Sequence, residues 1–132
     1  MKLRAVCLCA TALLMPSLAS AHHSFAMFDA EKTVTLTGTV KEFEWTNPHM
    51  WLYVMAPDAS GKVVEYPLEM QGPGQSVKNG WKQDSVKPGD KVTVDIHPLR
   101  TGARGGQLLS VTLPSGQKLF VTGRAPSPFG DE

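Results

Sequence analysis

The chain has 132 residues, with 13 Lys and Arg against 12 Asp and Glu, and this length allows one domain with a modest core. Removing residues 1–21, which have the pattern of an export leader, takes away two of the cations and no acid. The remaining 11 cations and 12 acids give a formal charge of −1, which excludes binding to nucleic acid through an excess of positive charge.

The first 21 residues have the three parts of a secretory signal peptide. A basic start and an apolar run over residues 5–14 precede Ala19-Ser20-Ala21, which has the small-x-small pattern that signal peptidase cleaves. We therefore expect residues 1–21 to be removed. The product then begins at His22 and is periplasmic or secreted.

The expected leader also determines the sulfur chemistry of the chain. Both cysteines, Cys7 and Cys9, lie in it, so the remaining chain can form neither a disulfide nor a thiolate metal site. No later apolar stretch approaches the roughly 20 residues that span a bilayer. We therefore expect a protein that is not embedded in a membrane.

Alternating apolar and polar residues predict an all-β domain. In the first strand Val34, Leu36 and Val40 share one face, and Gly38 indicates a bulge or a sharp bend. Turns rich in Asn, Pro, Gly and Asp separate the strands. The expected strands cover residues 33–40, which residues 42–45 can extend, and residues 49–55, 62–70, 92–97, 107–113 and 118–121. The expected core comprises Val34, Leu36, Val40, Leu52, Val54, Leu68, Val92, Val94, Ile96 and Val111.

A short helical link decides between two all-β folds. Gln75 to Asn79 can form one or two helical turns that end at Gly80. Three strands, a short helix and two or three further strands are the order of an OB-type barrel. We therefore expect a closed or partly open OB-like barrel of five to six strands over residues 22–122, with a β-sandwich as the alternative. For residues 123–132 we expect a flexible C-terminal tail.

The histidines predict a metal site. A chain that begins at His22 offers an amine and an imidazole, and His23 and His49 can add further nitrogen ligands. Copper(II) suits such a site because it has the highest affinity among the divalent metals. Cleavage after Ala19 instead gives Ser20-Ala21-His22, which also forms a square-planar copper(II) site. Thioethers of Met27, Met50, Met55 and Met70 can hold copper(I) if one lies close.

Simpler interpretations of these residues stay open. The histidine pair can mark only a processing site, and the ring of His49 can bond the Asn47 region within its turn. The fourth histidine, His97, can be an exposed strand residue, and methionines at strand spacing commonly fill a core. His49 is a better metal ligand than His97, because an Asn-Pro turn holds it rigidly at the start of a strand.

Aromatic residues give a second functional hypothesis. Trp45, Trp51, Tyr53 and Trp81 can form a stacking platform for a sugar or another flat ligand, as faces of this barrel type do. The alternative is that most of them are core or rim residues. Glu65 and Glu69 share one strand face and stand too far apart to share a proton, so they predict a solvated face.

Several motifs in order resemble a family of small exported bacterial proteins of unknown function. The motifs are His22-His23-Ser24-Phe25, Leu36-Thr37-Gly38-Thr39-Val40, Trp45-Thr46-Asn47-Pro48-His49, Gly80-Trp81 and Pro88-Gly89-Asp90-Lys91-Val92. The resemblance implies an exported β-barrel and brings no established activity. From the residues we expect a non-enzymatic binding protein for copper. The alternatives are an aromatic-lined ligand-binding or accessory barrel that serves an exported partner and, last, a small copper-dependent oxidase.

Overall fold

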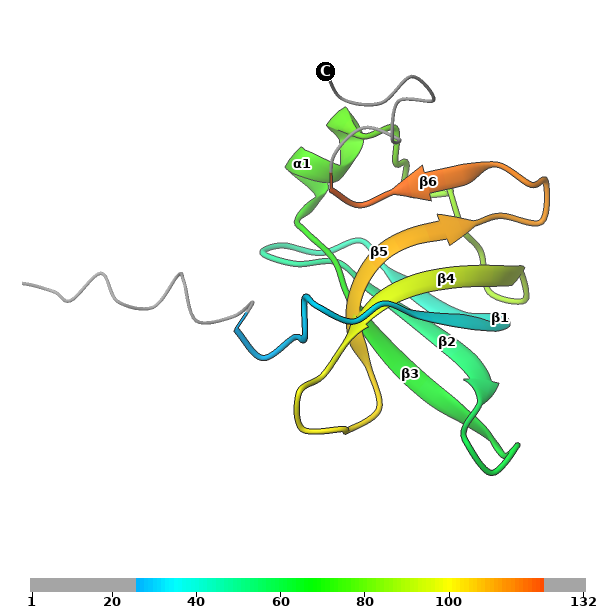
Figure 1. The fold of residues 1–132 in the computed structure, drawn as a ribbon. Coiled ribbons are helices and arrows are strands. Elements are labelled where there is room, and N and C mark those ends of the chain that lie inside the picture. The colour runs from blue at the N-terminus through cyan, green and yellow to red at the C-terminus, as the bar shows by residue number, and fades with distance from the viewer. Residues whose placement is uncertain (1–25, 123–132) are drawn as a thin grey trace, which may run out of the picture.

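The computed structural model describes residues 26–122, which form a small β-barrel with one short helix (Figure 1). The expected leader, His22, His23 and the expected tail lie outside the described residues. The elements are β1 (Val34–Glu44), β2 (Trp51–Pro57), β3 (Val63–Glu69), α1 (Pro73–Lys78), β4 (Lys91–Pro98), β5 (Gly106–Thr112) and β6 (Lys118–Phe120). Each predicted strand is present, and the helix begins at Pro73 instead of Gln75. Within this part of the chain, no helix has the length and apolar character needed to cross a bilayer.

Five strands close into a barrel, and the sixth extends the sheet beyond it. The hydrogen-bonded order is β3-β2-β1-β4-β5-β6, and a parallel contact joins β3 to β5. In that contact Leu68 lies beside Gly106 and Glu69 beside Gln107. The other strand pairs are antiparallel. The barrel order β1-β2-β3-β5-β4, with a helical link after β3, confirms the predicted fold.

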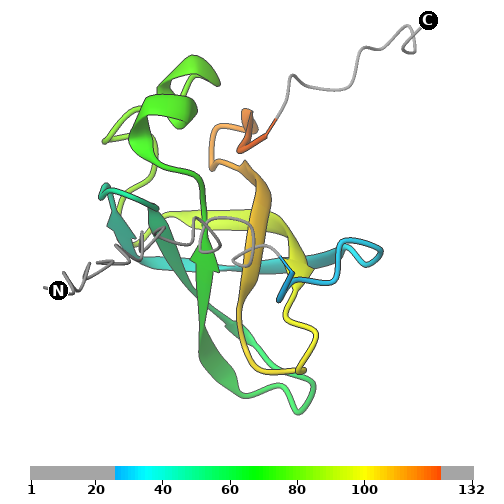
Figure 2. The same cartoon turned by 90° about the vertical axis from the view of Figure 1, so that its left-hand side faces the viewer.

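The helical link covers one end of the barrel. Both views place α1 at the end away from the turn between β2 and β3 (Figure 2). Trp81, which follows the helix, is 1% exposed, and its Nε1 donates a hydrogen bond to the carbonyl oxygen of Phe120 at 2.9 Å. Asn79 Nδ2 donates to the carbonyl oxygen of Val121 at 2.6 Å. These two bonds tie the link to the chain around β6.

The barrel interior contains most of the residues predicted for the core. The prediction for Val34 is wrong, because it is 37% exposed, whereas Leu36 is half-buried and packs against the core. β2 pairs with β1 only from Thr39 onward, so the first residues of β1 lack that neighbouring strand. The buried members of the predicted set are Val40, Leu52, Val54, Leu68, Val92, Val94, Ile96 and Val111.

The first strand, β1, pairs with two neighbouring strands along different parts of its length. Its first half pairs with β4 and its second half with β2, and the register against β2 shifts between Val40 and Glu42. The sequence predicted the bulge at Gly38, but the bulge lies further along the strand, between Val40 and Glu42. Gly38 has a different role, because a Cβ at this position would collide with the carbonyl oxygen of Met55. The glycine allows β1 to pass close to β2.

Substitution of Gly38 should be costly for this reason. We expect Gly38→Ala to lower the free energy of unfolding by about 1–3 kcal/mol, because the backbone of Met55 must move. Gly74→Ala is the matched control, since a Cβ there meets nothing within 4 Å and the position is helical, where Ala is favoured over Gly. Urea unfolding of both variants tests the prediction, which fails if the two substitutions have equal effects.

A carboxylate on the outer surface joins four strands. Asp95 of β4 accepts hydrogen bonds from Thr35 of β1 at 2.7 Å and from Ser110 of β5 at 2.9 Å. Lys118 of β6 lies 2.8 Å from the same carboxylate. The Lys118 ammonium and the two hydroxyl donors hold the pKa of Asp95 below its usual range, because they stabilise the ionised form.

Because of this network, we expect the free energy of unfolding to depend on pH in the acid range. Because the folded-state pKa of Asp95 lies below the usual value of 3.8, the stabilisation is complete above that value and is lost as pH falls through the folded pKa. We expect Asp95→Asn to cost about 1–2 kcal/mol at pH 7 and progressively less in acid. Urea unfolding at several pH values measures this difference. The exposed Asp84→Asn is the control, and a constant cost of Asp95→Asn at all pH values would contradict the prediction.

Candidate functional site

His49 lies at the end of the turn that leads into β2. The Asn47–Pro48 peptide is cis, and Thr46 Oγ1 donates to the carbonyl oxygen of His49 at 2.8 Å. Gly72 lies against this turn so closely that a Cβ there would be 2.6 Å from the carbonyl oxygen of Pro48. The backbone of His49 is thus fixed by contacts within the turn and across to the chain after β3.

The ring of His49 contacts a buried carboxylate. Its Nδ1 contacts Oε1 of Glu69, the last residue of β3, and Glu69 is only 6% exposed. The imidazole of His49 therefore contacts the carboxylate of Glu69. An ionised carboxylate only accepts hydrogen bonds, so Nδ1 carries the proton and Nε2 has the lone pair in the neutral ring. This is the arrangement that orients histidine ligands in metal sites.

The two glutamates of β3 have different surroundings. Glu65 forms an ion pair with Lys41 on the surface, which agrees with the predicted solvated face. The prediction is wrong for Glu69, because it is only 6% exposed and β5 pairs beside it. A buried carboxylate needs a partner that compensates for lost hydration, and His49 supplies one.

A pocket of about 180 Å³ lies directly against Glu69. Its walls are apolar apart from the side chains of Glu69 and Arg104. They are formed by Met27, Phe28, Trp51, Pro67, Glu69, Leu99, Arg104 and Gly106. The pocket therefore combines residues of β2, β3 and β5 with the segment before β1 and the loop after β4.

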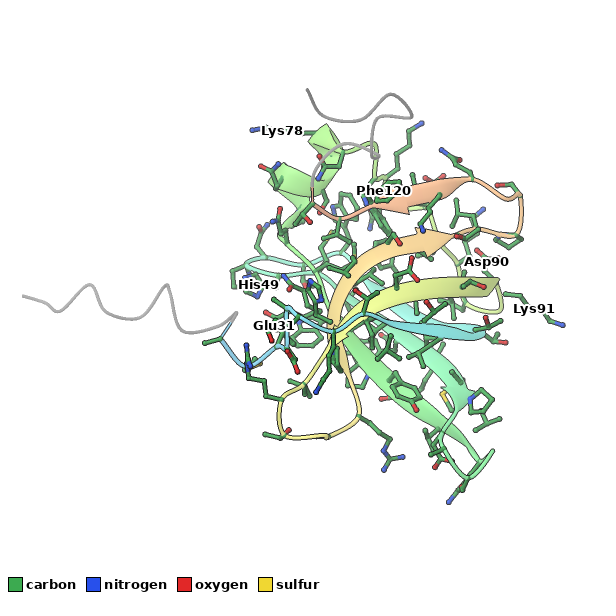
Figure 3. All side chains as sticks on the ribbon, in the orientation of Figure 1. Glu31, His49, Lys78, Asp90, Lys91 and Phe120 are labelled. Carbon is green, nitrogen blue, oxygen red and sulfur yellow. The ribbon has the colours of Figure 1, made fainter. Side chains whose placement is uncertain are left out.

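The segment before β1 is attached to the start of the loop after β4. Phe28 is 3% exposed and forms a β-bridge with Leu99, and the backbone nitrogen of Arg100 donates to the carbonyl oxygen of Met27 at 2.9 Å. Arg100 Nε also donates to the carbonyl oxygen of Ala26 at 3.1 Å. The described chain thus begins at the rim of the pocket, on the side of the molecule where Figure 3 shows His49.

The four aromatic residues of the predicted platform lie in different surroundings. Trp51 lines the pocket, whereas Trp81 is buried in the core and offers no face to a ligand. Trp45 packs edge-on against Phe43, with ring centroids 5.9 Å apart. Tyr53 follows Trp51 on the outer face of β2. Of the four, only Trp51 lines the pocket beside Glu69.

Charged neighbours surround Tyr53. Burial raises the pKa of its phenol above the usual value, and the nearby Glu44 carboxylate raises it further because a second negative charge is unfavourable there. Tyr53 is therefore a neutral phenol at physiological pH. In this form it can donate a hydrogen bond.

The remaining candidate metal ligands are spread over the barrel. His97 Nδ1 lies 2.8 Å from the carbonyl oxygen of Lys32, and Met50 and Met70 are buried in the core. Met27 differs, since it is 49% exposed and lines the pocket. Over residues 26–122, no three His, Cys, Asp or Glu side chains gather closely enough to hold a metal ion. His22 and His23, the other predicted ligands, lie outside these residues.

Comparison with known proteins adds a family. A model described as a family of unknown function (DUF6152) matches residues 11–109. The chain belongs to this family. The match extends from before the expected cleavage site into β5, and it agrees with the resemblance to a family of unknown function. No curated protein and no solved structure matches the chain.

Sequence analysis did not find Glu69 as the partner of His49, nor the pocket. Both depend on the contact between β3 and β5 and on the packing of Phe28 against Leu99. The available signal was weak. A glutamate in an alternating strand usually faces solvent, and Ala26-Met27-Phe28 precedes the first recognisable strand.

The contact with Glu69 predicts the proton position on His49. We expect the neutral ring to carry its proton on Nδ1, and we expect Glu69→Ala to remove this preference because the acceptor is gone. Long-range proton–nitrogen correlation spectra above pH 7.5 distinguish the two tautomers. His97 is the internal control, since its Nδ1 faces the carbonyl oxygen of Lys32 in both proteins. An unchanged tautomer ratio at His49 would contradict the assignment.

Proposed function

We propose that this chain is an exported binding protein, periplasmic or secreted, that takes copper(II) through its processed N-terminal histidines together with His49. The observation that carries the proposal is the contact between His49 Nδ1 and the carboxylate of Glu69, which lines the pocket. Carboxylate–imidazole pairs set both the tautomer and the direction of histidine metal ligands.

The path of the chain supports a site that joins the N-terminus to His49. Met27 and Glu69 line one pocket, and Glu69 contacts His49. His23 is four residues before Met27, which gives the intervening chain a reach of at most about 14 Å. The two terminal histidines are therefore tethered to the segment that lines this pocket together with Glu69, the residue that His49 contacts.

The chemistry of these groups suits copper in both oxidation states. The amine and imidazole of His22, with His23 and His49, form a nitrogen-rich set that favours copper(II). Met27 adds an exposed thioether at the same pocket, and such soft ligands favour copper(I). In this proposal the nitrogen ligands other than His49 come from the N-terminus. The described barrel therefore does not have to hold a metal ion with its own residues alone.

A second candidate function is binding of a small ligand beside an aromatic side chain. The apolar pocket with Trp51 in its wall favours it. In this case His49 and Glu69 support the pocket wall and no metal is involved. Copper titration separates the two functions, since only the first depends on a free terminal amine.

We expect the protein that begins at His22 to bind one copper(II), most tightly at neutral pH. One extra Met before His22 should weaken binding the most, because it displaces the terminal amine from the chelate. His49→Ala should weaken binding less, and Glu69→Ala by about tenfold, because the ring loses its orienting partner. Affinity should fall below about pH 6.5, where an ordinary imidazole takes up a proton.

Competition with a chelator of known affinity measures these changes. His97→Ala is the matched control and should bind copper like the unsubstituted protein, since His97 contacts Lys32 away from the site. The proposal is wrong if the Met-extended protein binds as tightly as the protein that begins at His22. It is also wrong in the part that concerns His49 if His49→Ala and His97→Ala behave alike.

A further inference from the structure

The pocket beside Glu69 has an apolar wall next to the point where the described chain begins. Met27 lines it and is 49% exposed, while Phe28, the next residue, is buried against Leu99. Trp51 and Pro67 complete the apolar surface. An apolar pocket of this kind is stabilised by an occupant that excludes water from its walls.

We propose that the ring of Phe25 occupies this pocket. Phe25 is two residues before Met27 and is the aromatic residue of the His22-His23-Ser24-Phe25 motif. A cavity of about 150 Å³ accommodates a benzene ring, and this pocket has a volume of about 180 Å³. The size and the apolar character of the pocket therefore match one phenyl group.

The attachment of the chain favours Phe25 over a free ligand. Hydrogen bonds from Arg100 hold the carbonyl oxygens of Ala26 and Met27, so the chain leaves from a fixed place. Two residues reach at most about 7 Å, which keeps Phe25 beside the pocket mouth. A group held by so short a tether has an effective concentration in the millimolar range or higher, so a dilute free ligand is at a disadvantage.

Docking of Phe25 deepens the proposed function, because it explains how the terminal histidines meet His49. With Phe25 in the pocket, His23 is two residues away from a ring that rests against the wall containing Glu69. Glu69 in turn contacts Nδ1 of His49. The docking itself involves no metal, so it can be tested separately from copper binding.

The test uses metal-free protein that begins at His22, labelled for NMR. We expect nuclear Overhauser contacts between the Phe25 ring and the methyl groups of Leu99 or the ring of Trp51. Phe25→Ala should open the pocket, so that phenol, followed through the Leu99 methyl shifts, binds at least tenfold more tightly than to the unsubstituted protein. Phe25→Leu should again exclude most phenol from the pocket, because the leucine side chain is also apolar and fills part of the same space. Phe120→Ala, which removes an aromatic ring from β6, should leave phenol binding unchanged.

Two results would overturn the docking of Phe25. One is the absence of contacts between Phe25 and the pocket, and the other is equal phenol binding by Phe25→Ala and the unsubstituted protein. Contacts without copper binding would leave the docking in place and contradict the proposed function. Copper binding without contacts between Phe25 and the pocket would support the proposed function and contradict the docking.

Discussion

The parallel contact between β3 and β5 closes the barrel and determines the surroundings of the candidate site. It joins two residues of each strand and depends on close backbone approach. Gly105, just before β5, has a φ of 124°, and a Cβ there would be 2.7 Å from the carbonyl oxygen of Pro67 in β3. Gly106 lies equally close to β4, since a Cβ there would collide with the carbonyl oxygen of His97. Glycine permits both conditions, because it has no side chain and tolerates positive φ. Without this closure, the end of β3 would be an open sheet edge.

Closure has a direct electrostatic consequence at Glu69. The residue lies in the seam beside Gln107 of β5 and is only 6% exposed, so its carboxylate is largely removed from water. His49 stands at the start of the neighbouring strand and meets this carboxylate. The barrel thus buries a carboxylate that lines the pocket and brings His49 into contact with it. That combination supports our proposals for His49 and for the terminal histidines.

Local sequence patterns were sufficient for the strands and for their order. Alternation located β1 to β6, and the helical link after β3 distinguished the barrel from a sandwich. The patterns failed where a property depends on distant pairing. Val34 alternates like a core residue, yet β2 has already diverged from it. The burial of Glu69 follows from a contact with a strand far along the chain, and the burial of Trp81 follows from hydrogen bonding to the chain around β6. The alternation of apolar and polar residues along the sequence carries no information about these contacts.

The last strand determines how the sheet meets other molecules. β6 lies at the end of the strand order, so one of its edges has no strand partner, and it is only three residues long. Open edges are where sheets of separate molecules join by backbone hydrogen bonds, and short edges offer few such bonds. Lys118 adds a charged side chain at this edge, held by Asp95. Among the described strands, the sheet therefore ends in a short, charged border that offers few backbone groups for extension by another chain.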